Sequence, residues 1–209
     1  MKTLTLITSA LAFVVLGCSN PYERDNPIDP YVAGIKAVQY EGQTYKTLVI
    51  GTKALGIKTW FAENLNYNAT GSKCYENLES NCDKYGRLYD WETAKTVCPA
   101  GWHLPSDAEW TALVNSTPGK KLKAMTGWNS SSNGDSGNGT DDYGFSALPG
   151  GRGYSDGRFS DVGDYGYWWS AYEDNSYRAY SRYIGYHYDY ARQGSYDKSY
   201  LFSVRCVQD

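Results

Sequence analysis

Five cysteines restrict the folds that this chain can adopt more than any other feature of its sequence: Cys18, Cys74, Cys82, Cys98 and Cys206. Disulfides form in exported chains and use cysteines in pairs, so an odd cysteine needs a separate explanation. Cys18 has one, because it alone directly follows an apolar N-terminal run. The other four form an even set, which predicts two disulfides in the folded part of the chain.

Residues 1–17 have the pattern of a bacterial lipoprotein signal peptide. Lys2 precedes an apolar run at 4–16, which is shorter than the roughly 20 residues that span a bilayer. The sequence VLGC at 15–18 resembles a lipobox, with cleavage before Cys18 and acyl chains on its thiol and amine. More than one acyl chain anchors a protein stably. We therefore expect lipidation at Cys18, and the alternative is a plain secretory signal with an accidental cysteine.

The lipidated cysteine begins a tether, and the folded domain follows it. Residues 18–34 contain three prolines among polar and charged side chains, which predicts a flexible segment. Ser19 and Asn20, rather than aspartate, follow the lipid site, a pattern that in lipoproteins of two-membrane bacteria implies an outer-membrane location. Residues 35–209 then form one domain. We expect a protein of the bacterial cell envelope.

The four cysteines of the domain allow three disulfide pairings. We favour Cys74 with Cys82, which closes a short polar loop, and Cys98 with Cys206, which ties the middle of the chain to its last strand. The long bridge constrains the unfolded chain more, by ~4 to 5 kcal/mol in the chain-entropy model. Zinc binding is the competing interpretation, but the sequence has no C-x-x-C pair and only two histidines.

The domain is predicted to be α+β, with short antiparallel strands, two short helices and much loop. Strands are expected at 44–50 and 58–62, followed by a short helix over 90–97. Ser106 and Glu109 have the spacing of a capping box, so a second helix begins there. Three aromatic runs near the C-terminal end predict further strands of an antiparallel sheet.

The segment 127–142 is almost free of apolar residues and is predicted to be a long loop. Its side-chain oxygens are of the kind that Ca²⁺ prefers, although their spacing is not that of an EF-hand. A solvated loop without a metal is the alternative. The candidate calcium ligands are Asn133, Asp135, Asn138, Asp141 and Asp142.

Tyrosine is unusually frequent, with 21 Tyr against 5 Phe, so the core must contain rings whose hydroxyl groups need partners. In the run 177–194, the alternation of a strand would place the even-numbered side chains on one face. Such a face either stacks sugar rings or packs as core, and we favour core. The residues of this stripe are Tyr180, Arg182, Ile184, Tyr186, Tyr188 and Tyr190.

Several long motifs resemble those of a known family. KTWFAENLNY, YGRLYDWETA, CPAGWHLPSDAEW, DDYGFSALPGG, GYWWSA and FSVRCV are similar to segments of the Fibrobacter succinogenes major paralogous domain. The resemblance runs from about Gln39 to Asp209 and implies an exported protein, since many members are lipoproteins. A weaker resemblance links HLPSDAEW and FSVRCV to the formylglycine-generating, sulfatase-modifying domains. It implies a C-type-lectin-like fold and no particular activity.

An enzyme is not expected. The formylglycine-generating enzymes use a pair of redox-active, copper-binding cysteines late in the domain, whereas this chain has only Cys206 there. The sequence has no serine-hydrolase, Walker, zinc-protease or dinucleotide-binding motif. The formal net charge of −3, or −4 once Lys2 is removed with the signal peptide, does not favour nucleic acid as a partner.

We expect a binding or adhesion module for carbohydrate, with no cofactor other than possible Ca²⁺. The contact surface would combine the loops at 127–142 and 152–158 with exposed aromatic side chains. Expected partners are the membrane, through the lipid anchor, and polysaccharide or envelope proteins. The alternative is a structural or protein-interaction module of the envelope without a small ligand. The candidate ligand-binding residues are Trp128, Arg152, Tyr154, Arg158, Tyr186, Tyr188 and Tyr190.

Overall fold

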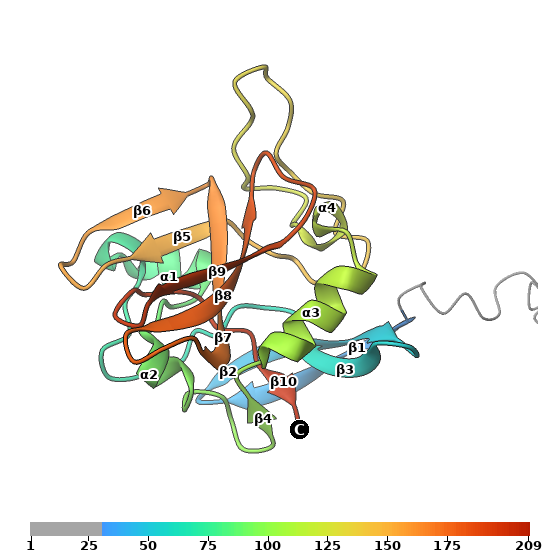
Figure 1. Ribbon diagram of the computed structural model, residues 1–209, viewed down its shortest axis with the longest axis horizontal. Coiled ribbons are helices and arrows are strands. Elements are labelled where there is room, and N and C mark those ends of the chain that lie inside the picture. Colours follow the sequence, from blue (N-terminus) through green and yellow to red (C-terminus); the bar gives the residue numbers. More distant parts are fainter. Residues whose placement is uncertain (1–30) are drawn as a thin grey trace, which may run out of the picture.

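Two β-sheets pack around an aromatic core, with short helices at their edges (Figure 1). The structure is a computed structural model that describes residues 31–209. The signal peptide predicted at 1–17, the lipid site at Cys18 and the tether as far as residue 30 lie outside the described residues. The predicted end of the tether at residue 34 is wrong, because strand β1 (Tyr31–Tyr40) already pairs with β2 from Tyr31 onward.

The first sheet has the strand order β1-β2-β3-β10-β4. β2 and β3 confirm the strands predicted at 44–50 and 58–62. The last strand of the chain enters between β3 and β4, where Val207 lies opposite both Trp60 and His103. The bounds of these strands are β2 (Gln43–Thr52), β3 (Gly56–Phe61), β4 (Trp102–His103) and β10 (Val207–Gln208).

The second sheet has the strand order β6-β5-β7-β8-β9. Its β5 and β7 pair in parallel, so the prediction of antiparallel strands is wrong at this point. The aromatic run 199–207 forms single bridges at Leu201, Phe202 and Ser203 before β10, rather than one long strand. The bounds are β5 (Gly150–Gly153), β6 (Phe159–Val162), β7 (Tyr165–Glu173), β8 (Arg178–Gly185) and β9 (Arg192–Asp197).

The helices are short, and two of them match the predictions. α3 (Asp107–Ser116) begins with the predicted capping box, in which the Ser106 hydroxyl and the Glu109 carboxylate each accept the other's backbone N–H. α2 (Trp91–Ala94) fills part of the predicted 90–97 helix. The unpredicted elements, which have no side-chain cap, are η1 (Tyr75–Asn77), α1 (Glu79–Tyr85) and α4 (Gly119–Leu122). The described chain is thus mainly β, and none of its helices is long and apolar enough to cross a membrane.

Arg205 joins distant segments inside the core. Its Nε donates to Oδ1 of Asn64 at 2.7 Å, and the same oxygen accepts the indole N–H of Trp168 at 2.8 Å. Its other guanidinium nitrogens donate to the backbone carbonyls of Phe61, Phe145 and Ser146. Burial lowers the pKa of Arg205 to about 9, which leaves the side chain charged at neutral pH.

Both favoured disulfides are present. Cys98 and Cys206 are bonded across 108 positions of sequence and join the segment before β4 to the segment before β10. Cys74 and Cys82 are bonded across 8 positions and join the start of η1 to α1. All four sulfurs of the domain are therefore used in structural bonds.

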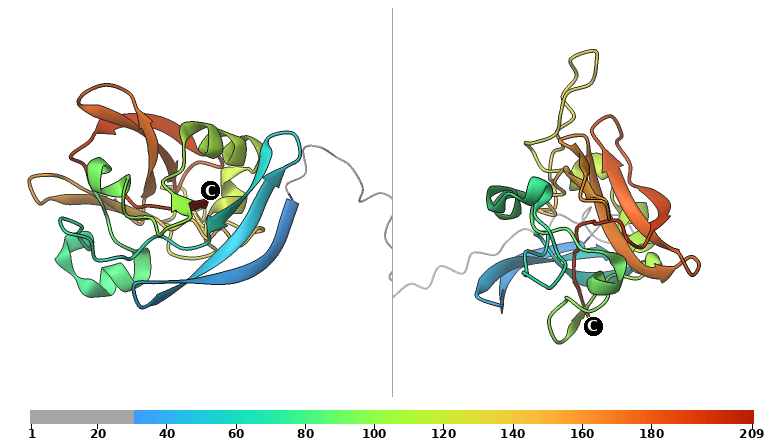
Figure 2. Two further views of the ribbon diagram at one scale, coloured as in Figure 1. Left: turned by 90° about the horizontal axis from the view of Figure 1, so that it is seen from below. Right: turned by 90° about the vertical axis from the view of Figure 1, so that its left-hand side faces the viewer.

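The chain's long loops gather at particular places on the molecule. The 127–142 loop projects from the body next to the turn between β8 and β9 (Figures 1 and 2). The hairpin of β5 and β6 lies at the end of the molecule opposite to the point where β1 begins (Figure 1). The loops predicted to form one contact surface, 127–142 and 152–158, thus belong to different regions.

Candidate functional site

One face of β7, β8 and β9 carries a continuous set of tyrosine rings. Tyr167 lies opposite Tyr183, and Tyr183 lies opposite Arg192, so these side chains project to the same face of the sheet. Ring centroids are 5.8 Å apart for Tyr165 and Tyr167, and 5.7 Å apart for Tyr167 and Tyr183. We call this set the tyrosine face, and it comprises Tyr154, Tyr165, Tyr167, Tyr183, Tyr196 and Tyr200.

The tyrosine face continues from β9 to the β5–β6 hairpin. The centroids are 6.3 Å apart for Tyr183 and Tyr196, 6.2 Å for Tyr196 and Tyr200, and 4.9 Å for Tyr200 and Tyr154. Tyr167 is buried in the core, and the other five rings of the set are half-buried, so part of each of those five reaches solvent. Of these five, Tyr165, Tyr183, Tyr196 and Tyr200 pack against the core. The packing holds the rings in place without covering them.

Two glycines make room for these rings. A methyl group on Gly194 would lie 2.4 Å from Cε2 of Tyr196, and one on Gly185 would lie 2.8 Å from Cε1 of Tyr165. Contacts under 3 Å force a neighbour to move. The absence of side chains at these positions therefore lets the rings lie across the strands.

An ion pair lies at the edge of the tyrosine face. Arg152 Nε is 2.9 Å from Oδ2 of Asp161, and the same oxygen accepts the Tyr167 hydroxyl at 3.0 Å. The Arg152 guanidinium lies 5.2 Å from the Tyr154 centroid and 5.1 Å from the Tyr167 centroid. Asp161 has φ of 70°, a left-handed conformation that aspartate tolerates better than most residues. The arrangement fixes a charged group among aromatic rings.

Burial keeps the hydroxyl groups of Tyr167 and Tyr196 protonated. It raises the pKa of Tyr167 well above its usual range and raises the pKa of Tyr196 to about 12. Protonated hydroxyl groups both donate and accept hydrogen bonds. The tyrosine face thus combines apolar ring surface with hydroxyl groups.

A cleft of about 530 Å³ opens beside Tyr154, between the β5–β6 hairpin and α2. Phe159 and Leu201 make its wall apolar. Its volume is in the range of small-molecule sites, which combine apolar walls with a few polar groups. The polar side chains that line it are Lys73, Asn77, Asp90, Glu92, Ser155, Lys198 and Ser199.

The residues after β8 form a second aromatic group, which we call the tyrosine turn: Tyr186, His187, Tyr188 and Tyr190. Lys123 holds this turn from within the protein, since its Nζ donates to the carbonyls of Tyr186 at 3.2 Å and Tyr188 at 3.1 Å. Lys123 is only 1% exposed, and burial lowers its pKa. The ammonium also lies 5.2 Å from the ring centroid of Trp128.

The tyrosine turn extends the tyrosine face. The His187 ring lies 5.9 Å from Tyr165 and 3.9 Å from Tyr188. The Tyr188 and Tyr190 centroids are 5.3 Å apart, and the Arg192 guanidinium lies 4.0 Å from the Tyr188 centroid. Aromatic contacts therefore continue from Tyr154 on one side of the sheet to Tyr190 on the other.

Sequence comparison decides the family. Residues 54–208 match the family described as Fibrobacter succinogenes major domain. The chain belongs to this family. No curated protein and no solved structure matches it. The part of the chain that matches contains both disulfides, the contacts of Arg205 and the whole tyrosine face.

In this Fibrobacter succinogenes major domain the recognisable motifs meet at Arg205. Phe61 and Asn64 come from KTWFAENLNY, Phe145 and Ser146 come from DDYGFSALPGG, and Arg205 lies in FSVRCV. These residues are buried or half-buried, and they hold distant segments together. The motifs that reveal the family thus serve the fold, and most of the tyrosine face lies outside them.

The structure divides the predicted ligand-binding residues into two groups. Arg152, Tyr154 and Arg158 lie together at the β5–β6 hairpin, with both guanidinium groups within 5.3 Å of the Tyr154 centroid. Tyr186, Tyr188 and Tyr190 form most of the tyrosine turn. The prediction that Trp128 contacts a ligand is wrong. Trp128 is 5% exposed and its indole N–H donates to the carbonyl of Ala147 at 3.1 Å, which makes it a core residue.

The predicted tyrosine stripe is right within β8, where Arg182 and Ile184 are buried as core, and wrong beyond its end. β8 ends at Gly185, so Tyr186, Tyr188 and Tyr190 do not continue the strand. Arg182 and Ile184 of β8 lie on the side of the sheet opposite to the tyrosine face. Arg182 pairs there with Asp107 of α3 at 2.9 Å, and Ile184 packs in the core. The odd-numbered Tyr183 is the residue of β8 that belongs to the tyrosine face.

The calcium candidates are not assembled around one point. Both oxygens of Asp141 accept hydrogen bonds from Ser146, Asp142 pairs with Lys121 at 3.2 Å, and Oδ1 of Asn138 accepts from the backbone of Trp128. Asn133 and Asp135 are exposed in the loop. Within residues 31–209 no group of three acidic or metal-binding side chains includes any of the three aspartates.

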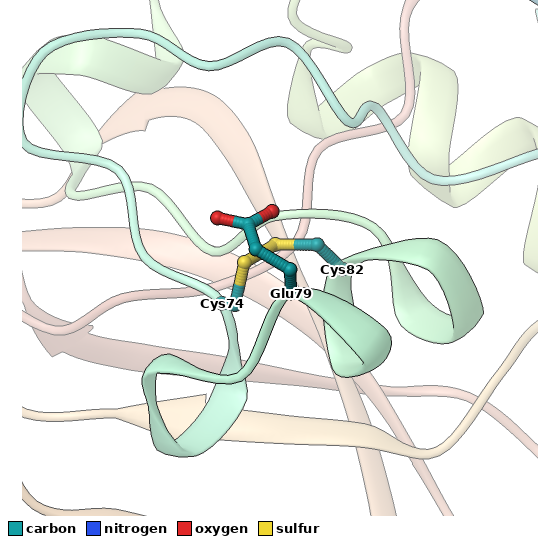
Figure 3. Close-up of side chains that lie close together, drawn as sticks. All are labelled: Cys74, Glu79 and Cys82. Carbon is teal, nitrogen blue, oxygen red and sulfur yellow. A yellow bond between two sulfur atoms is a disulfide. The ribbon is translucent and has the colours of Figure 1, made fainter.

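The one such group of the described chain is Cys74, Glu79 and Cys82 (Figure 3). Its two sulfurs are joined in a disulfide, so neither offers the thiolate that binds metal. The Glu79 carboxylate beside them pairs with Arg87 at 3.0 Å. This cluster is therefore structural.

Sequence reasoning missed the centre of the site. Tyr165, Tyr167, Tyr183, Tyr196 and Asp161 were not among the candidates, because only strand register brings them together. Gly185 and Gly194, each placed between tyrosines in the sequence, are the local signal that could have indicated closely packed rings.

Proposed function

We propose that this protein is a lipid-anchored protein of the bacterial outer membrane that binds carbohydrate along the tyrosine face. The observation that carries the proposal is the unbroken series of ring contacts from Tyr154 to Tyr190. Pyranose rings have flat apolar surfaces of C–H groups and hydroxyl groups at their edges. Tyrosine offers the matching combination of a flat apolar ring and a hydroxyl.

The extent of the face favours a polymer over a single sugar. A monosaccharide covers one or two aromatic rings, whereas the tyrosine face and tyrosine turn span three strands and the loops at both ends. Rings that are packed from behind lose little conformational freedom when a ligand binds, which favours affinity. The cleft beside Tyr154 would hold one end of the chain or a branch, where Lys198 and Glu92 offer charged partners.

We also propose that the fold is related to the C-type lectins. The bridge from Cys98 to Cys206 and the large share of loop support this relation, and ligands in such folds lie on loops. The contacts of Ser106 and His103, whose side chains are of the kinds that often serve in catalysis, support binding over catalysis. The Ser106 hydroxyl donates to Glu109 at 2.8 Å instead of to an imidazole, and His103 lies between Glu109 and Asp209.

Retention of the full chain on a panel of polysaccharides, including cellulose and xylan, tests the proposal. We expect retention on at least one polymer and weaker retention for Tyr190→Ala. Tyr177→Ala is the matched control, because Tyr177 is 77% exposed and lies outside the tyrosine face. Parallel columns with EDTA separate calcium-dependent from calcium-independent retention. If no polymer retains the protein, a structural or protein-interaction role in the envelope replaces carbohydrate binding.

A further inference from the structure

The tip of the hairpin between β2 and β3 is apolar and exposed. Leu55 is 44% exposed and Ile57 is 39% exposed, and Ala54 beside them is also exposed. Large aliphatic side chains are usually inside a protein, and several together on the surface indicate a contact with something apolar. Hairpin tips more commonly carry polar turn residues.

The apolar surface continues from the tip along α3. A shallow depression of about 600 Å³ runs between Leu55 on the hairpin and Ala108 and Ala112 on the helix. Tyr172, which is 54% exposed, lies at its far side. Ser106, Asp107, Thr111 and Asn115 also line this depression, so its apolar part consists of the hairpin tip, the two alanines of α3 and Tyr172. We call this apolar part the apolar tip.

The chain that carries the lipid site joins the domain beside the apolar tip. Tyr31 pairs with Gly51, which lies near the end of β2 where the hairpin turns (Figure 1). Twelve residues, 19–30, separate Tyr31 from Cys18. A fully extended chain of that length reaches about 40 Å, so a lipid on Cys18 would limit the distance between this side of the domain and the bilayer to about that length.

Two lysines flank the apolar tip. Lys53 is exposed at one side of Leu55, and Lys58 follows Ile57, with its side chain 43% exposed and Nζ 3.2 Å from Glu109. Long lysine side chains lie along apolar surface while the ammonium reaches the phosphate level of a bilayer. Apolar side chains at the centre with cations beside them suit the interface of a membrane.

We infer that the apolar tip docks on the lipid surface to which Cys18 is anchored, and so fixes the orientation of the domain. The inference rests on the lipid anchor of the proposed function. Because the β5–β6 hairpin lies at the opposite end of the molecule, docking turns the cleft beside Tyr154 away from the bilayer (Figures 1 and 2). The tyrosine face is then held outward, because the docked domain does not rotate freely on its tether.

The test uses the full lipidated chain, reconstituted in vesicles of phosphatidylethanolamine with a minority of phosphatidylglycerol. Ala54→Cys carries an environment-sensitive fluorophore, and the four bonded cysteines of the domain do not react. We expect a blue shift of the emission and quenching by lipids with spin labels in their chains. The same label at Asp156→Cys, in the β5–β6 hairpin, should report water.

Leu55→Ser combined with Ile57→Ser should return the emission at position 54 to its value in water, and Leu78→Ser is the matched control, since Leu78 is 52% exposed elsewhere. Equal emission at positions 54 and 156 in chains that float with the vesicles would overturn the docking and leave the anchor intact. Chains that carry no lipid at Cys18 by mass spectrometry and do not float would overturn the anchor itself.

Discussion

Arg152 and Asp161 form an ion pair at 2.9 Å that closes one end of the tyrosine face. Both side chains are about four-fifths buried, and the rings of Tyr154 and Tyr167 lie over the guanidinium. A charge in such a place is stabilised by its partner, so its removal leaves the partner buried without compensation.

Arg152→Gln should therefore lower the free energy of unfolding by about 1–3 kcal/mol, since a charge-assisted hydrogen bond and two ring contacts are lost. The control is Arg158→Gln, which removes a pair with Asp156 at 2.8 Å whose arginine is 76% exposed. Exposed ion pairs contribute little to stability, so we expect the free energy of unfolding of this variant to change by less than about 0.5 kcal/mol. Urea unfolding of both variants measures the difference, and equal losses would contradict the role of Arg152.

The two disulfides should differ in their contribution to stability. Removing the Cys98–Cys206 bridge, which spans 108 positions, should cost ~5 kcal/mol in the chain-entropy model. Removing the Cys74–Cys82 bridge, which spans 8 positions, should cost ~2.5 kcal/mol. Paired alanine variants and urea unfolding test this order. A larger loss for the short bridge would mean that native contacts, and not the unfolded chain, determine the effect.

Features that depend on neighbouring residues were predictable from the sequence. The capping box of α3 is written in four consecutive residues, and β2 and β3 follow from local β-branched and aromatic runs. The even number of cysteines predicted two disulfides, although their pairing was a preference among three possibilities. These features need no knowledge of which strand lies beside which.

The tyrosine face was not predictable in the same way, because register decides it. The alternation in 177–194 placed the even-numbered side chains on one face and favoured core there, and α3 does cover that side of β8 through the pair of Arg182 and Asp107. The same alternation did not show that the opposite face gathers tyrosines from three strands. Tyr183 points to the other side of β8, and the register of β7 and β9 places Tyr167 and Arg192 beside it there. A pattern of period two identifies two faces without saying which one is covered.

His103 makes stability depend on pH. Partial burial lowers the pKa of His103, but hydrogen bonds to Asp209 and Glu109 outweigh this effect and raise it above 6.5. The charged imidazole thus stabilises the fold fully below pH 6.5, and the contribution is lost as pH rises through the folded-state pKa. Burial raises the pKa of Glu109, but hydrogen bonds from Ser106 and His103 outweigh this effect and lower the pKa below 4.5.

The contribution of Glu109 is therefore complete above pH 4.5 and is lost as pH falls through its folded-state pKa. The pair should stabilise most between pH 4.5 and 6.5. His103→Gln should be less stable than the wild type in that window, and the difference should disappear as the pH rises through the folded-state pKa of His103. Urea unfolding across this range measures the gap, and a gap that stayed constant with pH would exclude the ion pair as its cause.

Arg205 should not tolerate replacement by lysine. Its planar fork donates to Asn64 and to three carbonyls in different directions, which a single ammonium cannot do. Arg205→Lys should cost about 3 kcal/mol, since buried acceptors lose their donors. Arg178→Lys at an exposed position is the control. Thermal unfolding followed by circular dichroism compares the two, and equal melting temperatures would contradict the bridging role.

Titration calorimetry with oligosaccharides of increasing length, cut from a polymer that retains the protein, tests carbohydrate binding along the tyrosine face most directly. The full chain should bind long fragments more tightly than short ones. Tyr154→Ala and Tyr190→Ala, at opposite ends of the ring contacts, should each weaken the long fragment by about tenfold, or ~1.4 kcal/mol, while Tyr177→Ala leaves it unchanged. Unchanged affinity in both end variants, with tight binding retained, would show that the ligand lies elsewhere.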